Sequence, residues 1–150
     1  MTNKEKVLNR ERQRGYEAAK LVQSNADSMT GTDLYAVDDR IPAFTAAVAK
    51  MNMLDRPIGF TCKSSAGRVV RLLQVYDSDI YTQEPEELPA QWGFKWSTDP
   101  AKALPFIAIS TSPYNTGECC SVDGTVYRST MDNNVWNPVD YPSGWEDVQS

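Results

Sequence analysis

One stretch near the C-terminus decides the fold. It begins with Gly117-Glu118-Cys119-Cys120-Ser121-Val122-Asp123-Gly124-Thr125-Val126-Tyr127-Arg128-Ser129 and closes with Pro138-Val139-Asp140-Tyr141-Pro142-Ser143-Gly144-Trp145. Asp123-Gly124 favours a two-residue β-turn, because both central positions of such a turn adopt a positive φ. That turn pairs Val122 with Thr125 and Cys120 with Tyr127. The first half of the stretch therefore predicts an antiparallel hairpin.

The closing segment, residues 138–145, contains two prolines. Neither Pro138 nor Pro142 has a backbone N–H to donate to a sheet, so we expect irregular chain that returns Trp145 to the hairpin. A buried aromatic side chain removes ~150–250 Å² from water, and a unit this small depends on one or two of them. Tyr127 and Trp145 are therefore the predicted core of this module.

An earlier part of the chain repeats the pattern. It contains Gly59-Phe60-Thr61-Cys62, a turn that ends at Gly67, then Val69-Val70-Arg71-Leu72-Leu73 and Pro85-Glu86-Glu87-Leu88-Pro89-Ala90-Gln91-Trp92. The spacings from Gly to Cys, from Pro to Pro and from the second Pro to Trp are the same in both copies. We therefore predict a duplicated β module, in which Trp92 is the counterpart of Trp145.

The rest of the chain is more helical in pattern. Residues 3–26 are rich in helix formers but carry only a thin apolar stripe, so a helix there would gain little by folding against its own domain. The polar segment Ser24–Thr32 is predicted as a linker, and Ile41–Met53 as a short helix. The predicted fold class is mainly β with an N-terminal α-helical segment and two small three-stranded β modules in tandem.

These patterns divide the chain into four regions. The predicted divisions are 1–32 as a helical anchor and linker, 33–56 as a short helical connector, 57–112 as the first, degenerate module with its connector, and 113–150 as the second module.

Composition excludes several kinds of chemistry. The chain has 150 residues, a net charge of -5 and no histidine, which removes Ser-His-Asp and Cys-His catalysis and nearly all usual zinc sites. Cys62, Cys119 and Cys120 fit neither a disulfide framework nor a metal-ligand spacing, so we expect reduced thiols, no metal and no cofactor. Glycoside hydrolysis needs two carboxylates across a cleft, but pairs such as Asp132 with Asp140 lie in solvated loops. No catalytic residue and no enzyme activity is predicted.

Charge separates the start of the chain from the remainder. Residues 1–26 carry six basic and three acidic side chains, whereas residues 27–150 have a net charge of -8. The acidic balance disfavours nucleic acid as a partner, and no stretch approaches the ~20 apolar residues of a membrane span. No apolar run of a classical secretion signal follows the first residues. The basic helix is either a solvated helix or one that pairs with its own copies or docks on an acidic neighbouring protein.

Some aromatic residues of the second module are left over after its core is assigned, and they are expected to be exposed: Tyr114, Trp136 and Tyr141. With Asn134 beside them, they suit a sugar ring, whose apolar face lies on an aromatic ring while its hydroxyl groups meet fixed polar partners. The first module has other residues at the matching positions: Arg56, Gln83 and Leu88. Only the second module is thus predicted to bind. Alternatively, Trp136 or Tyr141 simply covers the core tryptophan.

The second module resembles a known family. Tyr114-x-x-Gly117, Gly124-x-x-Tyr127, Asn134-x-Trp136-x-Pro138 and Tyr141-Pro142-x-Gly144-Trp145 are similar to the chitin-binding-type carbohydrate-binding modules of families 5 and 12, and more closely to versions in bacteriophage virion proteins. The resemblance covers residues 113–148 well and 57–93 in outline. It implies a compact three-stranded β fold whose surface aromatics bind polysaccharide, with Trp136 and Tyr141, then Tyr114, as the platform.

The same resemblance implies a function. It points to a non-enzymatic virion structural protein of the head, tail or fibre, made in the bacterial host cytoplasm and located in the virion. Residues 1–26 would attach it to other virion proteins, as a homo-oligomer, and the modules would contact host polysaccharide with the help of avidity. The alternative is a purely architectural capsid, neck or decoration protein whose modules bind proteins and bury Trp136 and Tyr141 in an interface.

Overall fold

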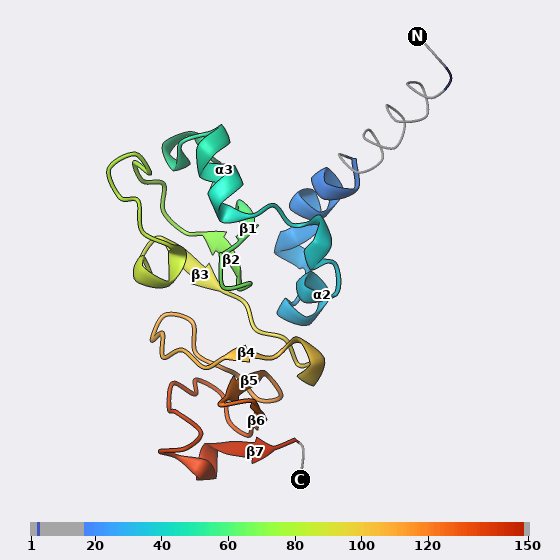
Figure 1. Ribbon diagram of the computed structural model, residues 1–150, viewed down its shortest axis with the longest axis vertical. Helices are drawn as coiled ribbons and strands as arrows, with labels where there is room; N and C mark the ends of the chain where they lie inside the picture. Colours follow the sequence, from blue (N-terminus) through green and yellow to red (C-terminus); the bar gives the residue numbers. More distant parts are fainter. Residues whose placement is uncertain (1–2, 4–16, 149–150) are drawn as a thin grey trace.

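The computed structural model describes Asn3 and residues 17–148, and it contains two small β-sheets in tandem (Figure 1). The first sheet is antiparallel, in the order β1 (Thr61–Lys63), β2 (Val69–Leu72), β3 (Trp92–Phe94). The second has the order β4 (Leu104–Pro105), β5 (Cys119–Val122), β6 (Thr125–Ser129), β7 (Trp145–Asp147). The predicted fold class, mainly β with an N-terminal helical segment and two small modules in tandem, is confirmed.

The second sheet has one strand more than predicted. β4 comes from the connector and pairs parallel with β5, with Leu104 opposite Cys120 and Pro105 opposite Ser121. Because Pro105 has no N–H to donate, β4 lies at the edge of the sheet. Phe106 continues the pairing by donating its N–H to the Ser121 carbonyl at 2.9 Å. The connector after the first module is therefore part of the second sheet.

The N-terminal part is a series of short helical elements. Residues 17–25 form a helix, followed by η1 (Ala26–Ser28), α2 (Gly31–Ala36), η2 (Asp38–Arg40), α3 (Phe44–Lys50) and η3 (Met53–Asp55). α2 begins with a capping box, in which Thr30 and Asp33 each accept a hydrogen bond from the other's backbone N–H. Residues 4–16 of the predicted N-terminal helix lie outside the described residues. No helix in the described part of the chain has the length and apolarity that a membrane crossing requires.

Two predictions for this part are corrected. The predicted linker Ser24–Thr32 is helical or turned over most of its length, and Ala26 within it is only 1% exposed. The predicted helix Ile41–Met53 is shorter, because residues 41–43 precede α3 as extended chain beside β1. There the Pro42 carbonyl accepts a backbone hydrogen bond from β1 at 2.9 Å.

The helix over residues 17–25 ends against the first sheet. A small core joins them, formed by Val22, Ala26, Leu34, Tyr35, Ile41 and Val69. The amide side chain of Gln23 accepts from the Thr61 N–H at 3.0 Å and donates to the Thr61 carbonyl. Asp27 forms an ion pair with Arg71 of β2. This end of the helix thus packs on its own domain, contrary to the expectation from its polar composition.

The duplicated modules have the same hydrogen-bond register. Each begins at a glycine in the left-handed region, Gly59 with φ +90° and Gly117 with φ +93°. The N–H of Gly59 donates to Leu72, and that of Gly117 donates to Ser129, both at 2.8 Å. A side chain is disfavoured at this φ, which explains why both copies keep glycine there. The turn of the second hairpin follows the predicted pairing, with Val122 opposite Thr125.

The core tryptophans occupy equivalent strand positions. Trp92 pairs with Leu72 at the end of β2, and Trp145 pairs with Ser129 at the end of β6. Both indoles are buried, with exposures of 0% and 6%. The repeat predicted from the spacing of glycines, prolines and tryptophans is therefore confirmed in the backbone.

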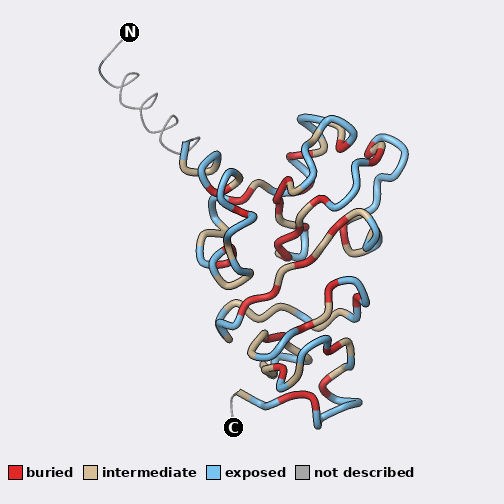
Figure 2. The backbone as a smooth tube through the Cα atoms, turned by 180° about the vertical axis from the view of Figure 1, so that it is seen from behind, coloured by how far each residue is buried: buried red, intermediate tan, exposed pale blue. Residues whose placement is uncertain are grey.

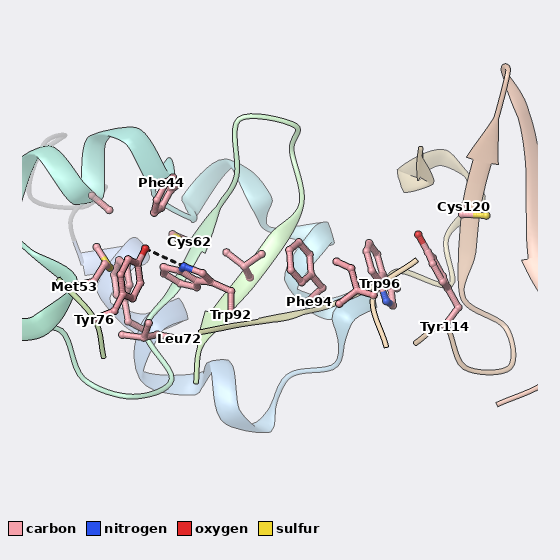
Figure 3. Packing of buried hydrophobic residues seen from close by; sticks show 14 of the residues in the cluster. Phe44, Met53, Cys62, Leu72, Tyr76, Trp92, Phe94, Trp96, Tyr114 and Cys120 are labelled. Atoms are coloured by element: carbon pink, nitrogen blue, oxygen red, sulfur yellow. Dashed lines mark hydrogen bonds between the residues drawn. The ribbon is translucent and has the colours of Figure 1, made fainter. Parts of the chain in front are cut away.

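One hydrophobic core runs through both sheets (Figure 3). Phe94 stacks on Trp96 with ring centroids 5.8 Å apart, and Trp96 stacks on Tyr114 at 4.4 Å. Tyr114 then meets the Trp145 ring edge-on at 5.3 Å. These aromatic contacts join the core of the first module to that of the second.

A buried ion pair also connects the first module to β4. The Arg68 guanidinium lies 2.9 Å from the Glu86 carboxylate, with side-chain exposures of 9% and 15%. Arg68 Nη2 also donates to the Pro105 carbonyl at 2.7 Å, and Ser64 donates its hydroxyl to Glu86 at 2.8 Å. The closing segment of the first module is thus attached to the connector.

Candidate functional site: an exposed aromatic pair

Two neighbouring aromatic side chains stand out on the second module. Trp136 is 56% exposed and Tyr141 is 41% exposed. Their ring centroids are 6.0 Å apart and the ring planes are tilted by 55°. Of the four residues predicted to form the carbohydrate platform, the structure brings these two together at the surface.

Asn134, predicted as a polar contact for sugar, is corrected to a buried structural residue. Its side chain is fully buried, and its amide nitrogen donates to Ser129 Oγ at 3.1 Å and to the Gly144 carbonyl at 2.9 Å. Its Oδ1 accepts the backbone N–H of Trp136 at 3.1 Å. Asn134 therefore positions the chain that carries Trp136 and does not face a ligand.

Tyr114, predicted as the third aromatic of the platform, is also corrected. Only 1% of it is exposed, because its ring lies between the rings of Trp96 and Trp145. Burial raises the pKa of its phenol. Its backbone bonds to Asn134 in both directions, at 2.9 and 2.8 Å. Tyr114 therefore supports the site from below.

The core residues of the second module hold the aromatic pair in place. The Trp145 indole N–H donates to the backbone carbonyl of Trp136 at 2.8 Å. Tyr127 is half-buried against the same core. In the first module the Trp92 indole instead donates to the Tyr76 hydroxyl at 3.1 Å.

Gly144 is a residue of the site for which the sequence predicted no role beyond its place in the motif. A Cβ there would lie 3.0 Å from the Tyr141 ring and 3.1 Å from the Asn134 amide. The Tyr141 ring therefore lies directly against the glycine backbone. The signal that could have found this role is the small residue immediately before the core tryptophan.

Hydrogen bonds between two loops complete the support. Thr116 N–H donates to Asp132 Oδ1 at 3.0 Å, and Asn133 N–H donates to Asn115 Oδ1 at 3.2 Å. The bond from Thr116 lowers the pKa of Asp132. Glu118 accepts the Asn115 N–H at 2.6 Å, while burial raises the pKa of its carboxyl. These bonds join the loop at residues 115–116 to the loop at residues 132–133, which leads to Trp136.

The matching positions of the first module form no such surface. Gln83 is exposed but carries no ring, and Leu88 packs partly against the core. Arg56 lies over the Phe60 ring, with its guanidinium carbon 4.3 Å from the ring centroid. The exposed aromatic pair is a property of the second module.

Residues 17–148 offer no metal centre, since nowhere among them do three or more metal-ligating side chains gather. Cys62, Cys119 and Cys120 are buried free thiols, and burial raises the pKa of each, to about 12 for Cys120. Raised pKa values make these thiols poor nucleophiles.

Comparisons with protein-family models, curated proteins and solved structures found no match.

Proposed function

We propose that this chain is a non-enzymatic structural protein of a bacteriophage virion, and that its second module binds polysaccharide through Trp136 and Tyr141. The observation that carries the proposal is the exposed aromatic pair, 56% and 41% accessible, on a loop fixed by buried hydrogen bonds. The resemblance of residues 113–148 to virion-borne chitin-binding-type modules supports the choice of ligand class and of setting.

The geometry suits a saccharide for physical reasons. Sugar rings present apolar C–H faces that pack on aromatic rings, and two rings tilted by 55° offer two such faces at one site. Asp140 and Ser143, which are exposed and close to Tyr141 in the sequence, are the polar residues that we assign to the sugar hydroxyl groups. Fixing the loop in advance lowers the ordering cost of binding.

Such a shallow site would bind each sugar weakly. Many copies on one particle would compensate, because linked sites raise the effective concentration of ligand at each neighbouring site. A virion that displays many copies of the second module would therefore bind polysaccharide firmly, although each single chain binds it weakly.

A purely architectural role is the second candidate function. Val139, two residues before Tyr141 in the sequence, is 64% exposed, so this segment exposes an aliphatic side chain as well as an aromatic one. Exposed apolar groups of this kind are also typical of protein interfaces. In that case Trp136 and Tyr141 contact another virion protein.

Binding to chitin beads and to a glycan array separates the two functions. We expect the intact chain to be retained, and Trp136→Ala to reduce retention at least about tenfold, since removing a central aromatic anchor costs about 2 kcal/mol or more. Gln83→Ala, at the equivalent position of the first module, is the matched control and should bind like wild type. Absence of binding, or equal binding by Trp136→Ala, contradicts the sugar proposal and leaves the architectural one.

The virion assignment has a separate test. Peptides of this chain should be found by mass spectrometry in purified particles of the phage that encodes it, at many copies per particle. Turnover of a polysaccharide by the pure protein would contradict the non-enzymatic part of the proposal.

A further inference from the structure

A groove with a basic rim lies on the side of α3 that faces the helix of residues 17–25. It has a volume of about 940 Å³, at the upper end of the roughly 300–1,000 Å³ of ligand clefts. Small and apolar side chains line it from both helices and from the chain before β1: Ala18, Ala19, Ile41, Ala46, Ala47 and Phe60. We call this feature the basic groove.

Four cationic side chains also line the groove, against one carboxylate, Asp39: they are Lys20, Arg40, Lys50 and Arg56. Within residues 17–148 none of these four cations belongs to an ion pair. A local excess of positive charge on a chain with a net charge of -5 marks a surface suited to an acidic partner.

Arg56 gives the groove a fixed charge. One guanidinium nitrogen donates to the Ala47 carbonyl at 3.0 Å, and the group lies over the Phe60 ring at 4.3 Å. Its Nε is buried and has no hydrogen-bond partner. The positive charge is therefore held in position by groups of the groove wall.

The same chain carries a surface of complementary character, residues 73–84, which we call the acidic loop. Residues 73–84 carry three carboxylates, Asp77, Asp79 and Glu84, and no basic residue. The loop exposes several large apolar side chains: Leu73 (48%), Val75 (45%), Ile80 (70%) and Tyr81 (53%). Apolar side chains among carboxylates match an apolar groove with a cationic rim.

The acidic loop has a defined shape. Asn52 donates its amide to Asp77 at 2.9 Å and accepts the Ser78 N–H at 3.2 Å, while the Ser78 hydroxyl accepts the Met53 N–H at 3.1 Å. The hydrogen bond from Asn52 lowers the pKa of Asp77, so this carboxyl is charged at neutral pH. Ile80 and Tyr81 come shortly after the turn that Asn52 holds at Asp77 and Ser78, and both side chains are exposed.

The groove and the loop lie on opposite sides of α3. Figure 1 shows the loop, coloured yellow-green, on the side of α3 away from the N-terminal helix, and the reverse view in Figure 2 agrees. One chain therefore cannot place its own loop in its own groove. Two complementary surfaces on opposite sides of one chain form a head-to-tail contact, which closes into a ring or continues as a filament.

We propose that the acidic loop of one copy inserts into the basic groove of the next, with Ile80 and Tyr81 against the apolar floor and Asp79 toward the cationic rim. Charge argues against the chain's own N-terminal segment as the occupant, because residues 1–16 are themselves net basic. The inference does not depend on sugar binding, since the groove and the loop belong to the N-terminal helices and the first module, whereas Trp136 and Tyr141 belong to the second module.

Sedimentation of the full chain over a range of concentrations tests the proposal. Wild type should associate, and higher salt should weaken the association because the rim charges are exposed. A groove variant, Arg40→Glu with Lys50→Glu, should weaken it by about 100-fold, since like charges across an interface cost several kcal/mol. A loop variant, Ile80→Ser with Tyr81→Ser, should have a similar effect. These four side chains are exposed, so folding should be unchanged.

Mixing the two variants gives the decisive result. A loop variant keeps its groove and a groove variant keeps its loop, so the mixture should form one-to-one dimers and nothing larger, although each alone is monomeric. Leu54→Ser, at an exposed apolar residue outside both the basic groove and the acidic loop, is the control and should associate like wild type. A monomeric wild type, association that survives both variants, or a mixture that stays monomeric would overturn the proposal.

Intermolecular cross-linking checks the register. Ala46→Cys combined with Tyr81→Cys should give disulfide-linked copies under mild oxidation, because Ala46 lines the groove. Ala49→Cys with Tyr81→Cys places the thiol on an exposed residue of the same helix that does not line the groove, and should give none. Equal cross-linking in the two pairs contradicts the docking geometry. Sugar binding measured on the same samples shows whether the proposed function stands independently.

Discussion

The two modules share a backbone register and differ in what their closing segments carry. In the first module Glu86 forms a buried ion pair with Arg68, and Leu88 packs inward. Counting from the first proline of each segment, the equivalent residues of the second module are Val139 and Tyr141, both exposed. The same scaffold thus serves as a structural joint in one copy and as a candidate binding surface in the other.

Replacing the core tryptophan of each module should have the largest effect on stability. Trp92 is fully buried between Phe44 and Tyr76, with ring centroids 5.7 and 6.2 Å away. Trp92→Ala should destabilise the protein by about 3–5 kcal/mol, and Trp145→Ala, nearer the surface, by less. Urea unfolding measures both, and Trp92→Phe gives a folded comparison if the alanine variant fails to fold. A larger loss for Trp145→Ala would contradict this ranking.

The buried ion pair gives the next largest expected effect. Glu86→Ala leaves the Arg68 guanidinium, 9% exposed, without its carboxylate, and should cost about 3 kcal/mol. Val139→Ala changes the equivalent residue of the second module and should stay within about 0.5 kcal/mol of wild type. Thermal unfolding of the two variants side by side provides the measurement. Equal stability of both would show that the closing segments do not differ in structural role.

Each module also has a loop held by one asparagine. Asn134→Ala removes bonds to Ser129 and Gly144 inside the core and should cost about 1–3 kcal/mol. Asn52→Ala releases the Asp77–Ser78 turn of the first module, where the amide is only half-buried, and should cost less. Hydrogen exchange should show faster opening of residues 130–137 in the first variant only. If Asn52→Ala opens that segment too, the loops are not independent.

The smallest effect depends on pH. Glu118 follows the first glycine of the second module, where the first module has the buried Phe60. Burial raises its pKa in the folded state, so protonation stabilises the fold; this stabilisation is complete below the unfolded pKa of about 4.3 and is lost as pH rises through the folded value. Glu118→Gln should therefore be more stable than wild type at pH 7 and equal to it near pH 4. Stability curves against pH measure the difference, and one that grows toward low pH would have the wrong sign.

The scaffold could be predicted because its signals are local. Asp123-Gly124 specifies its turn through φ, and Gly59 and Gly117 are required by the backbone at the start of each module. The spacing from Pro89 to Trp92, repeated from Pro142 to Trp145, then identifies the returning strands. Each of these features depends on residues a few positions apart, so it can be recognised in a single sequence.

The wrong assignments concern burial, which depends on distant segments. Tyr114 is covered by Trp96 and Trp145, and nothing in its neighbouring sequence indicates that contact. Asparagine is typical of exposed loops, yet the amide of Asn134 is buried and donates to Ser129 and to the Gly144 carbonyl inside the module. The edge strand β4 is too short and too rich in proline to produce a strand pattern. Contacts that form only in the folded chain, within the second module and between the two sheets, decide these positions.

The indole ¹⁵N spectrum of the intact chain, with and without chitin oligosaccharide, tests whether Trp136 forms an exposed sugar-binding surface. The indoles of Trp92, Trp96 and Trp145 donate to internal acceptors, whereas Trp136 is 56% exposed. We expect three indole signals that exchange slowly with solvent, a fourth from Trp136 that exchanges fast, and the largest sugar-induced shift on that fourth signal. A spectrum in which the Trp136 signal is protected, or in which sugar leaves it unmoved, would contradict the assignment of a binding surface to the second module.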